Sequence, residues 1–347
     1  MKFTHYILIL AALAQAVLAA PYADYYEAKK ALERGDLVEI AKPMSAYDTN
    51  RLLDLDASRI TVVGKGYSGY ELRQMVDKGG RYKLDSSHSA YDAQQVCDRG
   101  GDRVHVFGDG FSAYDLKKMA TVGSLLTVSS ELSAYDVLRI VTVGKSRIKV
   151  NAAGFSAYDL RRFAQAGAVI IGEIDESAYE ILRIIEAGGS VTVGSRFSGY
   201  DLLRFSTKGK ERVLIMGKDV SAYDLNKCAT AGARIVLDSS FSGYDLRQVA
   251  NSGGSRIWLE AAGVSAYDVR KYVEAGGQAI LGSHFSAYDV LQVTAIEPTR
   301  TWVDSDGFSE YDLRRIAQAG AKVFRSSARP YEHDFAKALR FAVLFTD

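Results

Sequence analysis

The chain has 347 residues, with 43 Lys and Arg against 42 Asp and Glu, and 48% of its residues are hydrophobic. This composition is typical of a folded polypeptide and excludes intrinsic disorder over most of the chain. The near-zero net charge gives no reason to expect a nucleic acid as a partner.

Residues 1–19 have the pattern of a cleaved secretory signal peptide. Lys2 gives a basic start, Tyr6 to Leu13 form an apolar run, and Val17-Leu18-Ala19 is typical of a cleavage site. Cleavage removes one of the 43 basic residues and leaves 42 against 42 acidic ones. We therefore expect a secreted or periplasmic protein. No other stretch is long and apolar enough for a transmembrane span.

A short motif, Ser-Ala-Tyr-Asp or a close variant, recurs through the rest of the chain. Its Tyr, used here as the marker of each unit, occurs fourteen times with spacings that alternate between 21 and 23 residues. The alternation breaks once, with two consecutive spacings of 21 around Tyr179. The markers are Tyr26, Tyr47, Tyr70, Tyr91, Tyr114, Tyr135, Tyr158, Tyr179, Tyr200, Tyr223, Tyr244, Tyr267, Tyr288 and Tyr311.

Each unit carries start and stop signals for a short helix, as the copy from Phe155 to Gly167 shows. Ser156 is suited to cap the first turn, and Asp159 to complete a capping box by reaching back to the cap nitrogen. Phe155 and Leu160 fit a hydrophobic staple, and Gly167 supplies the left-handed conformation that ends a helix.

Gly follows the marker by nine residues in twelve of the fourteen units. This constant interval predicts one helix length for all units, with the two extra residues of a long unit placed after the helix. A short alternating run follows each helix and is typical of a strand with one buried face. Such runs include Ile60-Thr61-Val62, Val104-His105-Val106, Ile148-Lys149-Val150, Val191-Thr192-Val193 and Ile257-Trp258-Leu259.

Alternating helices and strands at this spacing predict a right-handed, curved α/β solenoid of about fourteen units. Its strands must be parallel, because one helix separates each pair, and the sheet should lie on the concave side. We expect one domain over residues 20–329. The helix from Tyr25 to Arg34 should cap its start, and a segment over residues 330–347 should form a C-terminal capping helix.

The segment Ile235-Val236-Leu237, followed by Phe241-Ser242, Leu246 and Val249-Ala250, resembles the consensus of the leucine-rich repeat superfamily in its short, helix-bearing forms. The resemblance covers nearly all of the chain after the signal peptide, although the family's Asn after the strand is missing. It implies a ligand-binding concave sheet, most often for a protein partner.

The units differ most on the strand face that should point to solvent. The middle strand positions are polar or basic in the first half of the chain and apolar or aromatic in the second, where Trp258 and Trp302 occur. Arg precedes eight of the strands, and acidic residues follow several. These Arg and Asp columns either bind a ligand or neutralise each other across the sheet. The predicted ligand-binding residues are Arg212, Arg256, Trp258, Arg300, Trp302 and Asp304.

Other features favour structural roles. The marker tyrosines and the acidic residues after them occur in every unit and are interpreted as scaffold, with the tyrosines packed between coils. The irregular segment over residues 172–176 suits a cation or basic partner, although a register slip explains it more simply. Cys97 and Cys228, six units apart, should not pair. No spacing of His, Cys or Gly indicates a catalytic residue, metal or cofactor.

The leading hypothesis is a monomeric, exported, non-enzymatic module that binds a protein or peptide on its concave sheet. One alternative is a carbohydrate-binding envelope protein that uses Trp258 and Trp302 as stacking platforms. The other is a structural spacer without a ligand.

Overall fold

The structure is a computed structural model that describes residues 22, 24–35, 38–172, 174–305 and 307–324. The predicted signal peptide and the predicted C-terminal helix over 330–347 lie outside these residues. The described chain divides into two compact units, residues 22–172 with 187–189 and residues 174–186 with 190–324. We describe each unit by itself, and a single domain over 20–329 stays a prediction.

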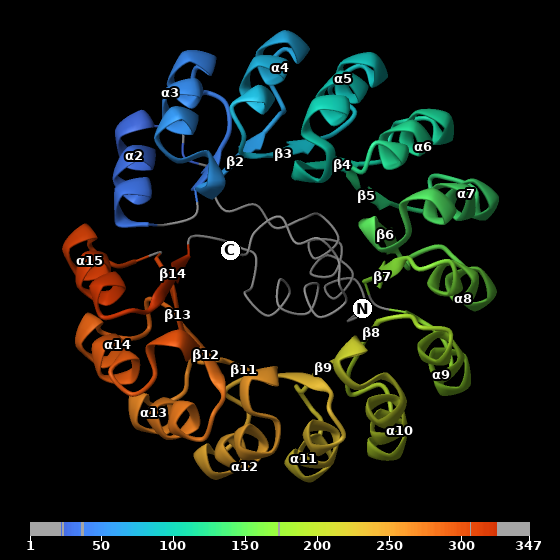
Figure 1. The fold of residues 1–347 in the computed structure, drawn as a ribbon. Helices are drawn as coiled ribbons and strands as arrows, with labels where there is room; N and C mark the ends of the chain where they lie inside the picture. Colours follow the sequence, from blue (N-terminus) through green and yellow to red (C-terminus); the bar gives the residue numbers. More distant parts are fainter. Residues whose placement is uncertain (1–21, 23, 36–37, 173, 306, 325–347) are drawn as a thin grey trace, which may run out of the picture. The chain divides into compact units, whose positions relative to one another are not determined.

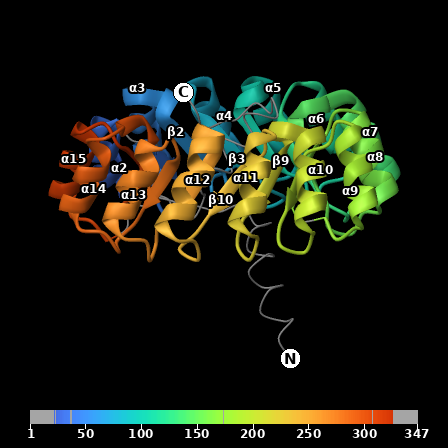
Figure 2. The ribbon, with the colours of Figure 1, turned by 90° about the horizontal axis from the view of Figure 1, so that it is seen from below.

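Each unit is a parallel α/β solenoid, which confirms the predicted fold class. In the first unit the strands pair in chain order from β1 to β7, and in the second from β8 to β14, always in parallel. Within each unit the helices form the outer layer and the strands the inner one (Figure 1). Seen from the side, the helices of each unit stand next to one another in a single layer (Figure 2).

The helices of the first unit are α2 (Tyr25–Arg34), α3 (Ala46–Asp56), α4 (Gly69–Asp77), α5 (Ala90–Gly100), α6 (Ala113–Thr121), α7 (Ala134–Gly144) and α8 (Ala157–Gln165). Its strands are β1 (Val38–Ile40), β2 (Ile60–Val63), β3 (Arg81–Leu84), β4 (Val104–Phe107), β5 (Leu125–Val128), β6 (Ile148–Asn151) and β7 (Val169–Ile171).

The helices of the second unit are α9 (Ala178–Glu186), α10 (Gly199–Gly209), α11 (Ala222–Thr230), α12 (Gly243–Gly253), α13 (Ala266–Glu274), α14 (Ala287–Thr294) and α15 (Glu310–Gln318). Its strands are β8 (Val191–Val193), β9 (Val213–Met216), β10 (Arg234–Leu237), β11 (Ile257–Glu260), β12 (Gln278–Leu281), β13 (Thr301–Asp304) and β14 (Lys322–Phe324).

Serine caps the helices as predicted, but the predicted capping box forms differently. The Ser156 hydroxyl accepts the Asp159 N–H at 3.2 Å and donates to the Asp159 carboxylate at 2.6 Å. A full box, with the carboxylate on the cap nitrogen, is present at Ser68, where Glu71 Oε2 accepts the Ser68 N–H at 2.7 Å. Glu71, one methylene longer than Asp, reaches the cap nitrogen there.

The prediction of a single helix length is wrong. Helices α4, α6 and α8 of 21-residue units span nine residues, whereas α3, α5, α7, α10 and α12 of 23-residue units span eleven. Two helices differ: α2 in a short unit spans ten residues, and α14 in a long unit spans eight. In the long units a 3-10 turn follows, such as Gly101–Arg103 or Lys145–Arg147. In five of the six long units the extra residues therefore lengthen the helix itself, and only after α14 do they lie behind the helix, as predicted.

The glycine nine residues after the marker has two different roles. In the short unit of α6, Gly123 has a φ of +99° and ends the helix in the left-handed conformation. In the long unit of α7, Gly144 is the last helical residue. A Cβ there would lie 2.3 Å from the side chain of Ile148, which begins the following strand. This glycine permits close packing of helix against strand.

Because the two glycines have different roles, substitution by Ala and by Asn should affect stability differently at each position. Gly144→Ala and Gly144→Asn should both cost about 1–3 kcal/mol of unfolding free energy, because any Cβ overpacks the contact with Ile148. Gly123→Ala should cost about 1 kcal/mol through backbone strain, whereas Gly123→Asn should recover most of it, since Asn tolerates the left-handed region. Urea unfolding of the four variants measures this. Equal losses for Ala and Asn at position 123 would contradict the assignment.

Candidate functional site

The predicted arginine column holds the helices together. In four long units the guanidinium reaches back to carbonyl oxygens at the end of the preceding helix. Arg103 Nη1 donates to Val76 O at 3.1 Å and to Gly80 O at 3.3 Å. The other three pairs are Arg59 with Gly35 O, Arg212 with Ile185 O at 2.8 Å, and Arg256 with Ala229 O at 3.0 Å. A cation there satisfies carbonyls that have no partner within the helix.

Arg212 and Arg256, which were predicted to bind a ligand, therefore make structural contacts with the end of the preceding helix. Arg300 ends the last 3-10 turn, Pro298–Arg300, and its Nη1 lies beside Gly276, which follows α13. The arginines of the short units differ. Arg234 begins β10, is only 7% exposed, and lies 3.3 Å from Glu211.

Arg103→Met keeps the apolar stem but removes the two hydrogen bonds to the end of α4. It should cost about 1.5 kcal/mol or more of unfolding free energy, because the lost bonds come from a charged donor. Arg270→Met, on the exposed surface of α13, is the matched control and should change stability by less than about 0.5 kcal/mol. Similar losses for both variants in urea unfolding would show that Arg103 caps nothing.

The two tryptophans lie together on the strand face opposite the helices. Ile257, next to Trp258, points at the helix layer, since a Cβ on Gly253 of α12 would meet its side chain. Alternation then places Trp258 on the other face, as predicted. The ring centroids of Trp258 and Trp302 are 5.6 Å apart, and Trp302 Nε1 donates to Gln278 Oε1 at 3.1 Å.

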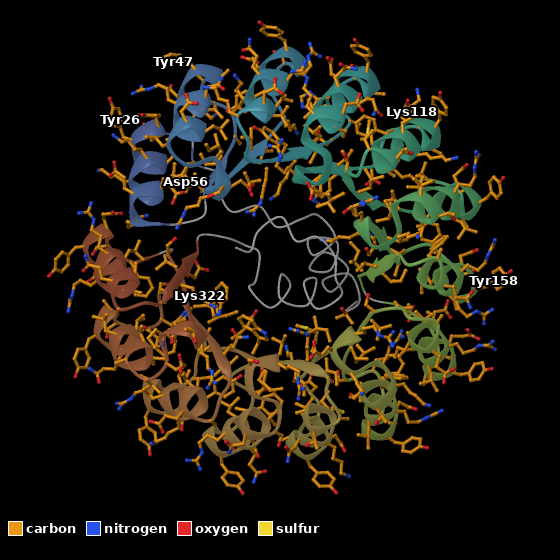
Figure 3. The ribbon with its side chains drawn as sticks, viewed as in Figure 1. Tyr26, Tyr47, Asp56, Lys118, Tyr158 and Lys322 are labelled. Carbon is orange, nitrogen blue, oxygen red and sulfur yellow. The ribbon has the colours of Figure 1, made fainter. Side chains whose placement is uncertain are left out.

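The predicted solvent exposure of Trp258 is wrong. Its side chain is 1% exposed, and Trp302 is half-buried beneath Lys322, whose Nζ lies 4.4 Å from the ring centroid. Lys322 points inward from β14 in Figure 3. The physical reason is that large side chains from neighbouring strands converge on this face. Asp304, the end of β13, is half-buried.

Trp258→Ala should therefore cost about 3 kcal/mol or more, the usual loss for truncating a buried aromatic side chain. Trp302→Ala, at a half-buried position two strands away, is the internal comparison and should cost clearly less. Thermal or urea unfolding measures both. Unchanged stability for Trp258→Ala would restore the interpretation of an exposed stacking platform.

The same strand face of the first unit is polar. Lys83 Nζ on β3 lies 2.6 Å from Glu39 Oε2 on β1, with both side chains 10% exposed. Burial raises the pKa of the Glu39 carboxyl, and Lys83 opposes that rise. His105 Nε2 lies 2.8 Å from Thr127 Oγ1, and burial, together with Lys149 and Lys83, lowers the pKa of the imidazole well below its usual value. These contacts connect strands and resemble a satisfied polar interior.

The remaining predicted features are also accounted for. Cys97 and Cys228 are buried free thiols, which confirms that they do not pair. Arg196 contacts the central irregular segment over residues 172–176: it forms an ion pair with Asp175 and donates to Ile174 O and Glu176 O, both at 2.7 Å.

Among the described residues no cluster of His, Cys, Asp and Glu is arranged for a metal ion, and no helix is long and apolar enough to cross a bilayer.

The marker tyrosines contradict the expected packing between coils. All fourteen side chains are exposed, from 58% at Tyr158 to 72% at Tyr47. Tyr26, Tyr47 and Tyr158 project outward from the helices in Figure 3, as does Lys118. Sequence reasoning assigned these residues to the scaffold because they occur in every unit.

A second row of side chains accompanies the tyrosines, one helical turn later. The residue four positions after each marker is Arg or Lys in ten units and Gln in four. Lys227 Nζ lies 3.9 Å from the ring centroid of Tyr223, and Lys118 Nζ lies 4.3 Å from that of Tyr114. Where Gln takes the place of the cation, Gln74 Nε2 donates to Tyr70 Oη at 2.7 Å.

We call the fourteen marker tyrosines and the residues four positions after them the tyrosine belt. It covers the outer helical layer of each unit, from α2 to α8 and from α9 to α15. The residues four positions after the markers are Lys30, Arg51, Gln74, Gln95, Lys118, Arg139, Arg162, Arg183, Arg204, Lys227, Gln248, Lys271, Gln292 and Arg315.

No family model matches the chain, and no curated protein matches it. Among solved structures, the leucine-rich repeat-containing protein LegL7 from Legionella pneumophila is 10% identical with a TM-score of 0.39, over 70% of this chain and 89% of that one. The YdjI aldolase from Escherichia coli K12 is 10% identical with a TM-score of 0.23, over 69% of this chain and 97% of that one. LegL7 contains leucine-rich repeats, the repeat type that the sequence resembles.

Proposed function

We propose that the protein is a non-enzymatic binding scaffold and that the tyrosine belt is its binding surface. The observation that carries this proposal is the exposure of every marker tyrosine. Core packing explains a residue that recurs at buried positions, but it does not explain one whose ring is at least 58% exposed in all fourteen units. The pairing of Tyr with a residue four positions later stabilises a helix by only about 0.2–0.5 kcal/mol.

The composition of the belt supports this role. Tyr and Arg are the residues that most often carry binding energy at protein surfaces, because each offers a large contact area together with hydrogen bonding. Packed helices lie about 8–10 Å apart, so each unit presents the same pair of groups at regular intervals. An extended partner that contacts several coils gains affinity from each of them without strong binding at any one.

The strand face of the second unit is a second candidate surface, now for a protein or peptide partner. The observation that favours it is the half-buried Trp302, with Lys322 over its ring and Asp304 two residues further along the same strand. Aromatic side chains next to charged ones are common in peptide-binding faces. The burial of Trp258 weakens this candidate relative to the belt.

Tyrosine-selective iodination of the full chain tests the first proposal and does not require the partner to be identified. A homogenate of the producing organism should slow the labelling of several consecutive marker tyrosines at least twofold, as read by mass spectrometry. Tyr82 and Tyr272 are internal controls, because both are buried and burial raises their pKa. Unchanged labelling of all fourteen markers would contradict a binding role and favour a structural spacer.

A variant with Ala at Tyr91, Tyr114, Tyr135 and Tyr158 separates binding from stability. These rings are exposed, so the melting temperature should stay close to that of the natural chain. Retention of the variant by the homogenate should fall at least tenfold. If the strand face is the binding surface, Trp302→Ala should reduce retention by the homogenate and the tyrosine variant should not.

A further inference from the structure

We infer that the partner of the tyrosine belt is a neutral, linear polysaccharide, an inference that rests on the proposed function. The basis is the arrangement of three rows of side chains on the outer helical layer. One row consists of the marker rings, the second of the Arg, Lys and Gln residues four positions later, and the third of the acidic residues directly after the markers. The third row is acidic in all fourteen units.

The acidic third row adjoins the tyrosine belt and compensates its positive charge. Ten cationic residues in the second row stand against fourteen carboxylates in the third. Thirteen of the fourteen carboxylates are half-buried, Glu27 being the exposed one. Asp92 is held in place, since it accepts from the Ser89 hydroxyl at 2.8 Å and from Arg73 at 2.9 Å. The belt together with the adjoining acidic row therefore carries no net positive charge, although the belt itself contains ten cations. A polyanion would meet a carboxylate beside every ring.

A sugar chain fits what remains. Its hydroxyl groups both donate and accept hydrogen bonds, so they match a surface in which donors and acceptors alternate. The C–H faces of its rings pack against aromatic rings, which carry negative charge on their faces. Identical sugar units repeat along the chain, as identical side chains repeat from helix to helix. A peptide segment with varied side chains gains nothing from such uniformity.

A groove in the second unit shows the same chemistry at close range. It lies between α12 and α13, with a volume of about 460 Å³, and is lined by Tyr244, Arg247, Gln248, Asn251, Lys271, Glu274 and Ala275. Lys271 Nζ and Glu274 Oε2 are 2.8 Å apart, so two of the charges in this groove neutralise each other. An aromatic ring, amide groups, an ion pair and the additional donor Arg247 give this groove several hydrogen-bonding groups beside an apolar face, which suits a hydroxyl-rich ligand.

The experiment repeats the iodination of the full chain with three homogenates: one digested with protease, one digested with nuclease, and one undigested in 1 M sodium chloride. Protection of consecutive marker tyrosines should survive all three treatments, because neither a protein nor a nucleic acid nor charge attraction is involved. Loss after protease would identify a protein partner, loss after nuclease a nucleic acid, and loss in high salt a polyanion. Each of these losses overturns the inference but leaves the belt as a binding surface.

Two sets of variants test the role of the rings with the protease- and nuclease-digested homogenate. Replacing Tyr200, Tyr223, Tyr244 and Tyr267 by Ala should reduce retention at least tenfold. Replacing the same residues by Phe, which keeps the ring and removes only the hydroxyl, should reduce it about threefold or less. Lys218→Ala, at an exposed position outside the belt, is the matched control and should bind as the natural chain does. Equal losses for Ala and Phe would rule out ring stacking on sugars.

Discussion

The helix of a 21-residue unit ends in carbonyl groups that have no partner within the helix. The glycine after the helix donates its N–H to such a carbonyl, and the arginine of the next long unit adds a charged donor, as Arg103 does for α4 and Arg256 does for α11. To bring its guanidinium there, the long unit extends its own helix to eleven residues and adds a 3-10 turn. In four of the six long units the two extra residues therefore bring the arginine to this contact, and those units work as pairs with their predecessors.

The pairing of units explains why a repeat protein alternates two lengths rather than using one. A helix of nine residues is too short to be stable in isolation, so it depends on contacts with its neighbours. The arginine contact ties the ends of four short helices, α2, α4, α9 and α11, to the following coil, while a side-chain cap holds the beginning of the helix. At α8 and α9 two short units follow each other, and the hydrogen-bonded sheet divides between β7 and β8.

Most of the fold could be predicted from the sequence, because caps, glycines and alternating strand residues are local signals. What failed depends on contacts between units. The same Gly nine residues after the marker ends α6 at Gly123 but packs against Ile148 at Gly144, and the interval alone does not distinguish the two. The strand face of Trp258 followed from alternation, whereas its burial depends on side chains from other strands.

The exposure of the marker tyrosines could have been predicted from the sequence. In α6 the buried residues Leu116, Met119 and Ala120 follow Tyr114 by two, five and six positions. At about 100° per residue, Leu116 points roughly 200° away from Tyr114, on the opposite side of the helix. Helical periodicity thus predicts an exposed ring, with Lys118 beside it. The tyrosines were interpreted as scaffold because they occur in every unit. A solenoid, however, repeats its outer surface as well as its core, so occurrence in every unit does not distinguish the two. Recurrence at an exposed position points to a partner that itself repeats.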